Sequence, residues 1–361
     1  MSNDKSNLKD LRKQIDELDQ HLVELLSTRA RVVVQIGECK RGDDTPVYAP
    51  DREQQVLRRV RDANDGPLPD KCLEAIWREM MSGSFALERS LRIGYLGPPG
   101  SYSHLAARRK FGASIDYEAV EDIASVFHGV AGRRLDLGVV PFENSTDGGI
   151  GETLDTFLEA DVRVYAELLI SVRHNLLANC ELSQVTKVYS KPPALAQCRQ
   201  WLTSHLKDAQ RIPTVSTSQA AEIAANESGA AAVASTLAGE MYGVHVLESG
   251  IEDNPSNVTR FFVIALHEAK PSGDDKTAIL FTTAHKTGAL ADVLDVFRKH
   301  ELNLTHIDTR PSRRVNWEYY FFVDVTGHKD TPHVAAALEE AAQHCRRLTV
   351  LGSFPRATDV L

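Results

Sequence analysis

Apolar and polar positions alternate along this chain in three successive patterns. Between residues 7 and 39 there is no proline and one glycine, and apolar residues recur at steps of three and four, at Leu8, Leu11, Ile15, Leu18, Leu22 and Leu25. This spacing predicts one long amphipathic helix with a coiled-coil-like seam. Breaks at 41–46 and 65–69 predict two more helices, at about 50–64 and 70–88. Three such helices cannot enclose a core alone, so we expect residues 1–91 to form an all-α module that pairs with a second copy.

From Arg92 onwards short apolar strands alternate with helical patterns. Strands are expected at 92–97, 136–140, 162–168, 187–190, 229–235, 244–248 and 258–266. This alternation predicts an α/β domain over residues 92–268 with largely parallel sheets, in which ligands bind at the carboxyl ends of strands. A polar linker, 268–276, then leads into a strand–helix–strand–strand–helix–strand order. That order predicts an α+β ferredoxin-like domain over residues 277–361, a type that commonly senses ligands or dimerises.

Composition narrows the possible functions. The chain has 361 residues and a formal net charge of −9, which disfavours nucleic-acid binding and requires cations to be gathered locally around any anionic substrate. The polar amino terminus and the lack of a long apolar run disfavour both a secretion signal and a membrane span. Five scattered cysteines indicate reduced thiols in the cytoplasm. Thirteen histidines show no metal-binding spacing, so no metal is expected.

Cations on the first predicted helix form a candidate site. Arg29 and Lys40 are eleven residues apart, which is within about 20° of whole turns, so they share a face. Arg12 lies about 100° away around the helix and would more easily reach a site in a partner subunit. The second helix adds Arg52 and Glu53, and the third places Ser84 and Glu88 at i, i+4. The alternative is that these are solvated surface charges.

The segment LRKQIDELDQHLVELLSTR, with GECK and DRE after it, resembles the all-helical chorismate mutases. The resemblance implies that the three helices intertwine with those of a second copy. The resemblance implies that Arg12, Arg29 and Arg52 grip the two carboxylates of chorismate through bidentate bonds, with Ser84 also at the substrate. It further implies that Lys40 donates to the ether oxygen whose bond breaks. Catalysis would consist of holding the substrate compact and stabilising developing charge.

Two positions depart from that family's usual pattern. Ala49 stands where an aspartate often contacts the substrate hydroxyl, which leaves Glu53 as the expected partner for that hydroxyl. Glu88 stands where a glutamine commonly faces the ether oxygen. An ionised carboxylate would repel that oxygen, so we expect Glu88 to act only when protonated. Mutase activity should then fall as pH rises, and Glu88→Gln should flatten this dependence.

The stretch LGVVPFENSTDGGIGETLD, residues 137–155, ends an apolar strand in a carboxylate, an amide, hydroxyls and glycines. It resembles the PIENSxxG signature of prephenate dehydratases. GPPGSYSHLAA (97–107), STSQAA (216–221) and NVTRFFVI (257–264) resemble three more of their motifs in the same order. Together these segments extend the resemblance over residues 92–268 and imply a two-lobed α/β domain like that of periplasmic binding proteins.

This second resemblance implies dehydration and decarboxylation of prephenate to phenylpyruvate. Ring aromatisation drives that reaction, so no redox or pyridoxal cofactor is expected. Thr259 would assist the leaving hydroxyl, in a network with Glu143. The carboxylate and keto oxygens would be bound by backbone amides at glycine-rich helix starts and by Ser101, Asn144, Ser145, Ser190, Gln197 and Arg260. The alternatives are an ordinary helix-capping loop at 143–144 and a plain strand threonine at 259. SKPPALAQC (190–198) departs from the family's usual SHPQ.

The last domain carries GALADVLDVF (288–297) and IDTRPSR (307–313), which resemble the GAL and ESRP motifs of ACT domains. The resemblance implies a phenylalanine site that includes Gly288, Ala289, Leu290, Asp308, Thr309, Arg310 and Pro311. Asp308 and Thr309 replace the usual Glu and Ser but keep the functional group. The alternative is a dimerisation domain without a ligand.

The order of the three segments implies a cytoplasmic homodimer, or a higher homo-oligomer, that makes phenylpyruvate from chorismate under feedback by phenylalanine. Three rivals stay open: one inactive centre, most readily the mutase; a non-catalytic sensor of small acids; and a dehydratase that prefers arogenate. No GxGxxG follows a predicted strand, which disfavours a dehydrogenase.

Overall fold

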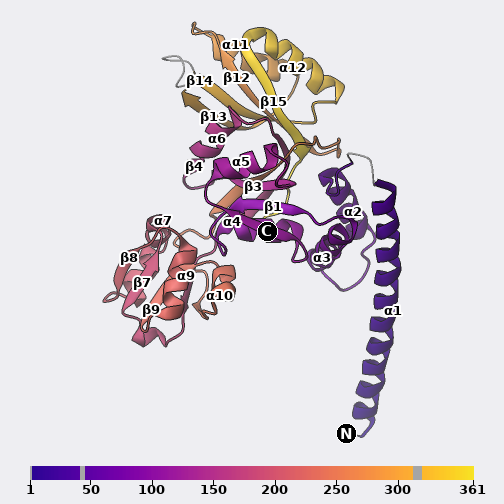
Figure 1. The fold of residues 1–361 in the computed structure, drawn as a ribbon, viewed down its shortest axis with the longest axis vertical. Coiled ribbons are helices and arrows are strands. Elements are labelled where there is room, and N and C mark those ends of the chain that lie inside the picture. Colours follow the sequence, from indigo (N-terminus) through magenta and orange to yellow (C-terminus); the bar gives the residue numbers. More distant parts are fainter. Residues whose placement is uncertain (1, 41–44, 312–318) are drawn as a thin grey trace.

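The computed structural model describes residues 2–40, 45–311 and 319–361 and begins with a helical module (Figure 1). Helix α1 spans Ser2–Lys40, α2 spans Pro50–Asp62 and α3 spans Asp70–Glu88. These bounds confirm the three predicted helices. Helix α1 extends away from the body of the molecule and contacts α3 near its carboxyl end (Figure 1).

The first lobe of the α/β domain is a sheet with strand order β2-β1-β3-β11-β5, with β4 (Gly148–Gly149) paired to β3. Its strands are β1 Arg92–Leu96, β2 Asp116–Val120, β3 Leu137–Asn144, β5 Arg163–Ser171 and β11 Val258–Ala265. Helices α4 (Tyr102–Phe111), α5 (Ile123–Ala131) and α6 (Gly151–Phe157) accompany it. Strands β1, β2 and β3 are parallel, but β11 is antiparallel to both β3 and β5.

The second lobe has strand order β10-β6-β9-β7-β8, with β7 parallel to β8 and β9 and antiparallel pairs at β6. Its elements are β6 Asn175–Ala178, η1 Leu182–Gln184, β7 Lys187–Ser190, α7 Pro192–Gln197, α8 Arg199–His205, β8 Gln210–Pro213, α9 Thr217–Asn226, β9 Ala230–Ala234, α10 Thr236–Tyr242 and β10 Val246–Glu248. The expectation of largely parallel sheets is therefore wrong, because strands that enter and leave the second lobe run against their neighbours in both sheets.

The carboxyl-terminal domain contains β12 Asp275–Thr283, α11 Ala289–Lys299, β13 Leu304–Pro311, β14 Tyr319–Thr326, α12 Pro332–His344 and β15 Cys345–Pro355. This order and the antiparallel arrangement β13-β14-β12-β15 confirm the predicted sandwich. Its two helices cover one face of the sheet. The other face packs on the first lobe through Leu280, Phe322 and Phe354, in one core with Phe127 and Phe262.

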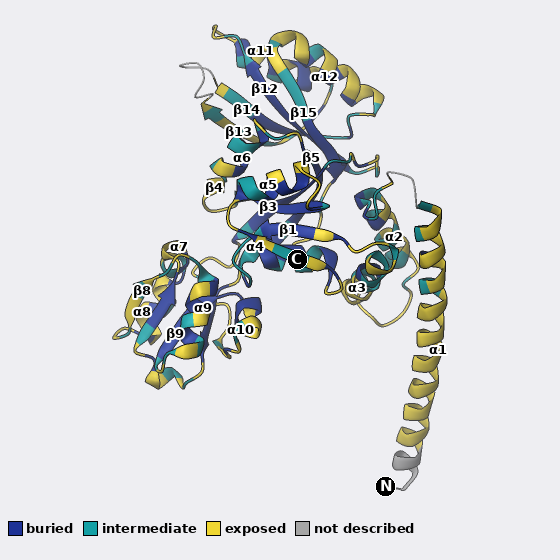
Figure 2. Cartoon of the chain, in the orientation of Figure 1, coloured by how far each residue is buried: buried dark blue, intermediate teal, exposed yellow. Residues whose placement is uncertain are grey.

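The burial pattern separates the helical module from the rest (Figure 2). The two α/β lobes and the last domain have buried strands, whereas most of α1 is exposed, including Leu11, Ile15, Leu18, Leu22 and Leu25. Within the described residues, none of the helices combines the length and apolar character that crossing a membrane requires. Helix α1 therefore carries the predicted apolar seam, and the described residues of the chain leave it exposed.

Candidate active sites

A cavity of about 730 Å³ lies between the two lobes of the α/β domain. The first lobe contributes the loop after β1, with Ser101 and Tyr102, and the ends of β3 and β11. The second lobe contributes the starts of α7 and α9, among them Lys191 and Thr217. Helix amino termini present free backbone N–H groups and partial positive charge, so α4 and α9 both favour an anion in this cavity.

A cross-strand pair of neutral side chains lines the cavity. Thr259 on β11 lies opposite Asn144 on β3. The Asn144 amide nitrogen donates to the Thr259 hydroxyl oxygen at 2.9 Å and to the Asn257 side-chain oxygen at 2.8 Å. The Asn144 oxygen accepts from the backbone N–H groups of Thr146 and Asp147. Since Thr259 accepts from Asn144, its own hydroxyl hydrogen is free to donate into the cavity.

A second set of hydrogen bonds extends this pair across the cavity. Gln197 Oε1 accepts from Asn257 at 3.3 Å and lies 2.8 Å from His174 Nε2. His174 Nδ1 lies 3.1 Å from the Tyr102 hydroxyl. Burial lowers the pKa of His174, so the ring is neutral and donates from Nε2 to Gln197, whose Oε1 only accepts. This network holds both lobes' polar groups in fixed orientations.

Sequence reasoning missed Tyr102, His174 and Asn257 as site residues. Tyr102 and Asn257 lie inside motifs that the sequence analysis singled out, so their position there was an available signal. His174 lies in the short connection between β5, which ends at Ser171, and β6, which begins at Asn175, and a polar residue after a predicted strand is a usable signal in an α/β domain.

Glu143 and Arg260 were expected at this site and lie elsewhere. They oppose each other across β3 and β11, one residue from Asn144 and Thr259, and so point to the opposite face of the sheet. Glu143 Oε2 is 3.2 Å from His306 Nδ1 of the last domain, and that contact lowers the pKa of Glu143. The predicted network between Thr259 and Glu143 is therefore wrong.

Arg260 is 7% exposed and serves the interface with the last domain. Its guanidinium lies 2.6 Å from Glu167 and 2.6 Å from Asp324, and Lys276 lies 3.0 Å from Glu167. Negative neighbours raise the pKa of Arg260 although burial opposes this. A substrate-binding role for Arg260 is contradicted, because carboxylates of the protein already surround its charge.

The three serines that were predicted to bind the dehydratase substrate lie in different environments. Ser101 lines the cavity and caps α4, where it accepts from His104 N. Ser145 does not line the cavity, and its hydroxyl accepts from Val258 N at 3.0 Å. Ser190 is fully buried and donates to Val233 O at 2.6 Å. Substrate contact is thus contradicted for Ser145 and Ser190, whereas Gln197 does line the cavity.

One positively charged side chain lines the cavity, at a position that no motif marked as a binding residue. Lys191, noted only as a departure from SHPQ, is the one lysine or arginine among the described residues that line the cavity. Two carboxylates, Asp147 and Glu222, line it as well. The binding of an anion here therefore depends on Lys191, the neutral donors and the helix termini together.

In the helical module α1 and α3 bring two predicted pairs together. Arg29 donates to the Ser84 hydroxyl at 2.6 Å, and Lys40 lies 2.6 Å from Glu88 Oε1. Gly37 allows this approach, because a Cβ at that position would lie 3.2 Å from Glu88 Cγ. Arg29 and Lys40 therefore point to a common partner helix instead of to solvent.

The remaining mutase residues are not gathered there. Arg12 is exposed on the free half of α1, and Arg52 is exposed on α2, where it reaches only Gln55 at 3.4 Å. Glu53 is buried and accepts from the Tyr48 hydroxyl at 2.8 Å and from Lys110 at 2.6 Å. The expectation that Glu53 faces a substrate hydroxyl is contradicted, because its charge is paired with the α/β domain.

The predicted sensor residues occupy two places in the last domain. Gly288 has φ +81° and starts α11, followed by the buried Ala289 and by Leu290. On β13 the side chains alternate, with Asp308 and Arg310 turned inward and Thr309 and Pro311 exposed. Arg310 binds both oxygens of Asp155 on α6, at 3.0 and 2.8 Å. The last residues of the second motif, Ser312 and Arg313, lie outside the described residues.

Fold and sites together define a multidomain enzyme: a helical module, a two-lobed domain with a polar cavity and a ferredoxin-like domain against it. Family models match in that order: chorismate mutase type II at residues 11–89, prephenate dehydratase at 93–269 and the ACT domain at 277–343.

Relatives that align over nearly the whole chain have names that combine the same two activities. The bifunctional chorismate mutase/prephenate dehydratase of Aquifex aeolicus is 42% identical over 97% of this chain and 98% of its own. The enzyme of that name from Pseudomonas aeruginosa is 39% identical over 98% and 99%. A prephenate dehydratase from Arthrobacter aurescens, solved with L-Phe, superposes with a TM-score of 0.68 at 29% identity, covering 74% of this chain and 90% of that one.

The chain belongs to the family of bifunctional chorismate mutase/prephenate dehydratases. It is an enzyme with an isomerase domain and a lyase domain, followed by an ACT domain.

Proposed function

We propose that residues 1–91 rearrange chorismate to prephenate, that residues 92–268 convert prephenate to phenylpyruvate, and that residues 277–361 bind phenylalanine as a feedback signal. The observation that carries the dehydratase assignment is the Asn144–Thr259 pair at the wall of the interlobe cavity, in which the Thr259 oxygen accepts from Asn144 and its hydroxyl hydrogen is available to a substrate.

In the dehydratase reaction Thr259 donates to the ring hydroxyl as it departs, while its oxygen is held by Asn144. Lys191, Gln197 and the amino termini of α4 and α9 bind the carboxylates and the keto oxygen. Loss of the hydroxyl and of carbon dioxide makes the ring aromatic, which drives the reaction. The protein therefore supplies orientation and hydrogen bonds.

In the mutase reaction Arg29 holds a carboxylate and Lys40 donates to the ether oxygen. Because Arg12 lies about 25 Å along α1 from Arg29, it contributes to the site of the partner subunit. The exposed leucine seam of α1 supports a homodimer in which the two long helices cover each other. All five cysteines carry free thiols, which supports a reducing, cytoplasmic location.

Phenylalanine would act through the contact of β13 with the α/β domain. Asp308 approaches Gly149, and Arg310 holds Asp155, on the segment that follows Asn144. A ligand that changes the position of β13 would thereby change the wall of the cavity. Inhibition requires that phenylalanine bind the two arrangements with unequal affinity.

One experiment tests these assignments together. Chorismate is supplied to the full-length enzyme, and prephenate and phenylpyruvate are followed with time, with and without phenylalanine. We expect prephenate to rise first, phenylpyruvate to follow, and phenylalanine to slow the second step. Accumulation of prephenate without phenylpyruvate would mean an inactive dehydratase centre, and no consumption of chorismate an inactive mutase.

Arogenate is a second candidate substrate for the cavity, on a specific observation. It carries an amino group where prephenate has the keto oxygen, and Asp147 and Glu222 are carboxylates that line the cavity and can accept from an ammonium group. The ratio of kcat/KM for arogenate and prephenate decides between them. A ratio below one assigns the cavity to prephenate.

A further inference from the structure

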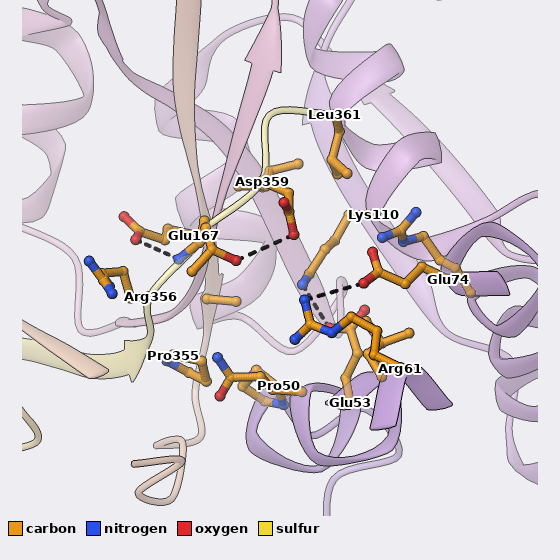
Figure 3. A pocket seen from close by; sticks show the side chains of 17 residues that line it. Pro50, Glu53, Arg61, Glu74, Lys110, Glu167, Pro355, Arg356, Asp359 and Leu361 are labelled. Atoms are coloured by element: carbon orange, nitrogen blue, oxygen red, sulfur yellow. Dashed lines mark hydrogen bonds and ion pairs between the residues drawn. The ribbon is translucent and has the colours of Figure 1, made fainter. Parts of the chain in front are cut away.

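The mutase helix α2 is joined to the dehydratase domain by a buried ion pair. Lys110 Nζ, near the carboxyl end of α4, lies 2.6 Å from Glu53 Oε2 on α2, and the side chains are 16% and 7% exposed. In Figure 3 the two side chains point toward each other at a cavity between α2, β5 and the carboxyl-terminal tail. A buried charge needs such a partner, so this contact is selective for a cation at position 110.

Tyr48 extends the ion pair into the dehydratase core. Its hydroxyl donates to the same Glu53 oxygen at 2.8 Å, and its backbone oxygen accepts from the Tyr165 hydroxyl at 2.8 Å. The Tyr48 ring is 2% exposed and packs edge-on against Phe111 and Tyr165. Burial and the carboxylate of Glu53 raise the pKa of Tyr48 well above its usual value. The start of α2 is thus embedded in the neighbouring domain.

This arrangement determines the direction of the residue that precedes Glu53 on α2. Arg52 precedes Glu53 and lies about 100° around the helix, so anchoring Glu53 inward turns Arg52 outward. Helix α2 also packs on α3, which carries Ser84 and Glu88. The anchor at Lys110 therefore fixes the rotation of α2 about its own axis, and with it the direction of Arg52, while α2 packs on α3.

We propose that Lys110 of the dehydratase domain is a positioning residue for the mutase reaction, acting through Glu53 to orient Arg52 toward chorismate. The proposal rests on the carboxylate-binding role that the resemblance to chorismate mutases implies for Arg52. It departs from the role that the sequence suggested for Glu53, because the carboxylate here binds protein groups on its buried side.

The test measures steady-state mutase and dehydratase kinetics on the full-length enzyme. For Lys110→Met we expect the mutase KM for chorismate to rise by about 10-fold with kcat changed less than about 2-fold, since a carboxylate contact of the ground state is misplaced. Lys110→Arg should restore KM to within about 3-fold, because the guanidinium also pairs with Glu53. The matched control is Arg109→Met, an exposed cation of the same helix, which should leave KM unchanged.

The dehydratase activity of each variant on prephenate reports whether the chain is folded and should stay within about 2-fold of the parent. In a double-mutant cycle, Glu53→Gln with Lys110→Met should raise KM no more than either change alone. If Lys110→Met does not fold, the Lys110→Arg and Glu53→Gln variants decide: a KM altered only by Glu53→Gln, beyond any effect on folding, overturns the proposal in favour of direct substrate contact by Glu53.

Arg52→Met separates this proposal from the one on which it rests. If Arg52→Met raises KM and Lys110→Met leaves it unchanged, the positioning role of Lys110 is overturned and the substrate role of Arg52 stands. If Arg52→Met leaves KM unchanged, the role of Arg52 fails, and with it the route assigned to Lys110. Equal increases in both variants support the two proposals together.

Discussion

The two catalytic domains differ in how much of each centre a single chain supplies. In the dehydratase cavity, Asn144 and Thr259 are held by hydrogen bonds within the chain, and Thr259 is 8% exposed. In the mutase module, Leu18 and Leu25 on α1 are 61% and 67% exposed, although the helix contacts α3 at its other end. The polar groups of one centre are thus held by packing within the chain, whereas the other centre lies beside an apolar face that the described residues leave exposed.

The two domains also differ in how much apolar surface they leave exposed to water. Each fully buried leucine contributes about 1.5–3 kcal/mol relative to an exposed one, so the seam of α1 holds a large unused driving force. The dehydratase domain has already used its apolar surface in the cores that the last domain shares. Perturbing a cavity residue should therefore affect one activity, and perturbing the seam should affect assembly.

Thr259→Val is the substitution that we expect to affect the two activities most unequally. Removing the hydroxyl while keeping the shape should lower the dehydratase kcat by about 10³-fold, because an oriented donor to the leaving group is lost. Mutase activity on chorismate should not change. Thr259→Ser is the control and should retain activity to within about 10-fold. A valine variant with normal phenylpyruvate production contradicts the role of Thr259.

Arg260→Met examines the opposite face of the same strand. Removing the guanidinium leaves Glu167 and Asp324 buried beside each other, although Lys276 still pairs with Glu167. We expect the free energy of unfolding in urea to fall by about 3 kcal/mol. Arg298→Met is the control, because its pair with Asp295 is exposed and is worth about 0.3–0.5 kcal/mol. Unchanged stability with a raised KM for prephenate would restore the substrate role that the sequence suggested.

Negative charges introduced into the apolar seam of α1 test whether the mutase centre needs a second subunit. Leu18→Glu combined with Leu22→Glu should convert the proposed dimer to a monomer in analytical ultracentrifugation. Mutase activity should fall by roughly 100-fold, because Arg12 of the second copy is lost from the site. Dehydratase activity should stay within about 3-fold. His21→Glu, exposed on the same helix, is the control. Full mutase activity in a monomeric variant would contradict the shared site.

Acid should produce the mildest effect, through a buried histidine of the α/β domain. Burial lowers the pKa of His104 to about 4, whereas the unfolded side chain has a pKa of about 6.5. Between these values the unfolded chain binds more protons, so stability present above pH about 6.5 is lost as pH falls toward 4.

Urea titrations at pH 7 and pH 5 measure this loss. We expect the His104 contribution to be about 1 kcal/mol, smaller than the full shift implies because the nearby cavity admits water. His104→Gln keeps an acceptor for Gly100 N, which bonds His104 Nδ1 at 3.1 Å, and should reduce the difference between the two pH values. An unreduced difference in this variant excludes His104 as its source.

Local patterns determined the elements and the family. The third helix was predicted at 70–88 and spans Asp70–Glu88, because apolar spacing and flanking prolines are properties of the segment itself. The ordered motifs marked the dehydratase domain for the same reason, since Asn144 and Thr259 lie within short stretches that are readable without a structure. The order of strands and helices likewise determined the ferredoxin-like domain.

Only the tertiary structure decided what each motif residue faces. Glu143 and Asn144 are neighbours in one motif, yet the strand sends one to the last domain and the other to the cavity. The Ser190 hydroxyl donates to Val233 O, and the Glu53 carboxylate accepts from Lys110 of another domain. A sequence specifies which groups are present, but a group's role depends on what packs against its side of the strand or helix, and those neighbours come from distant parts of the chain.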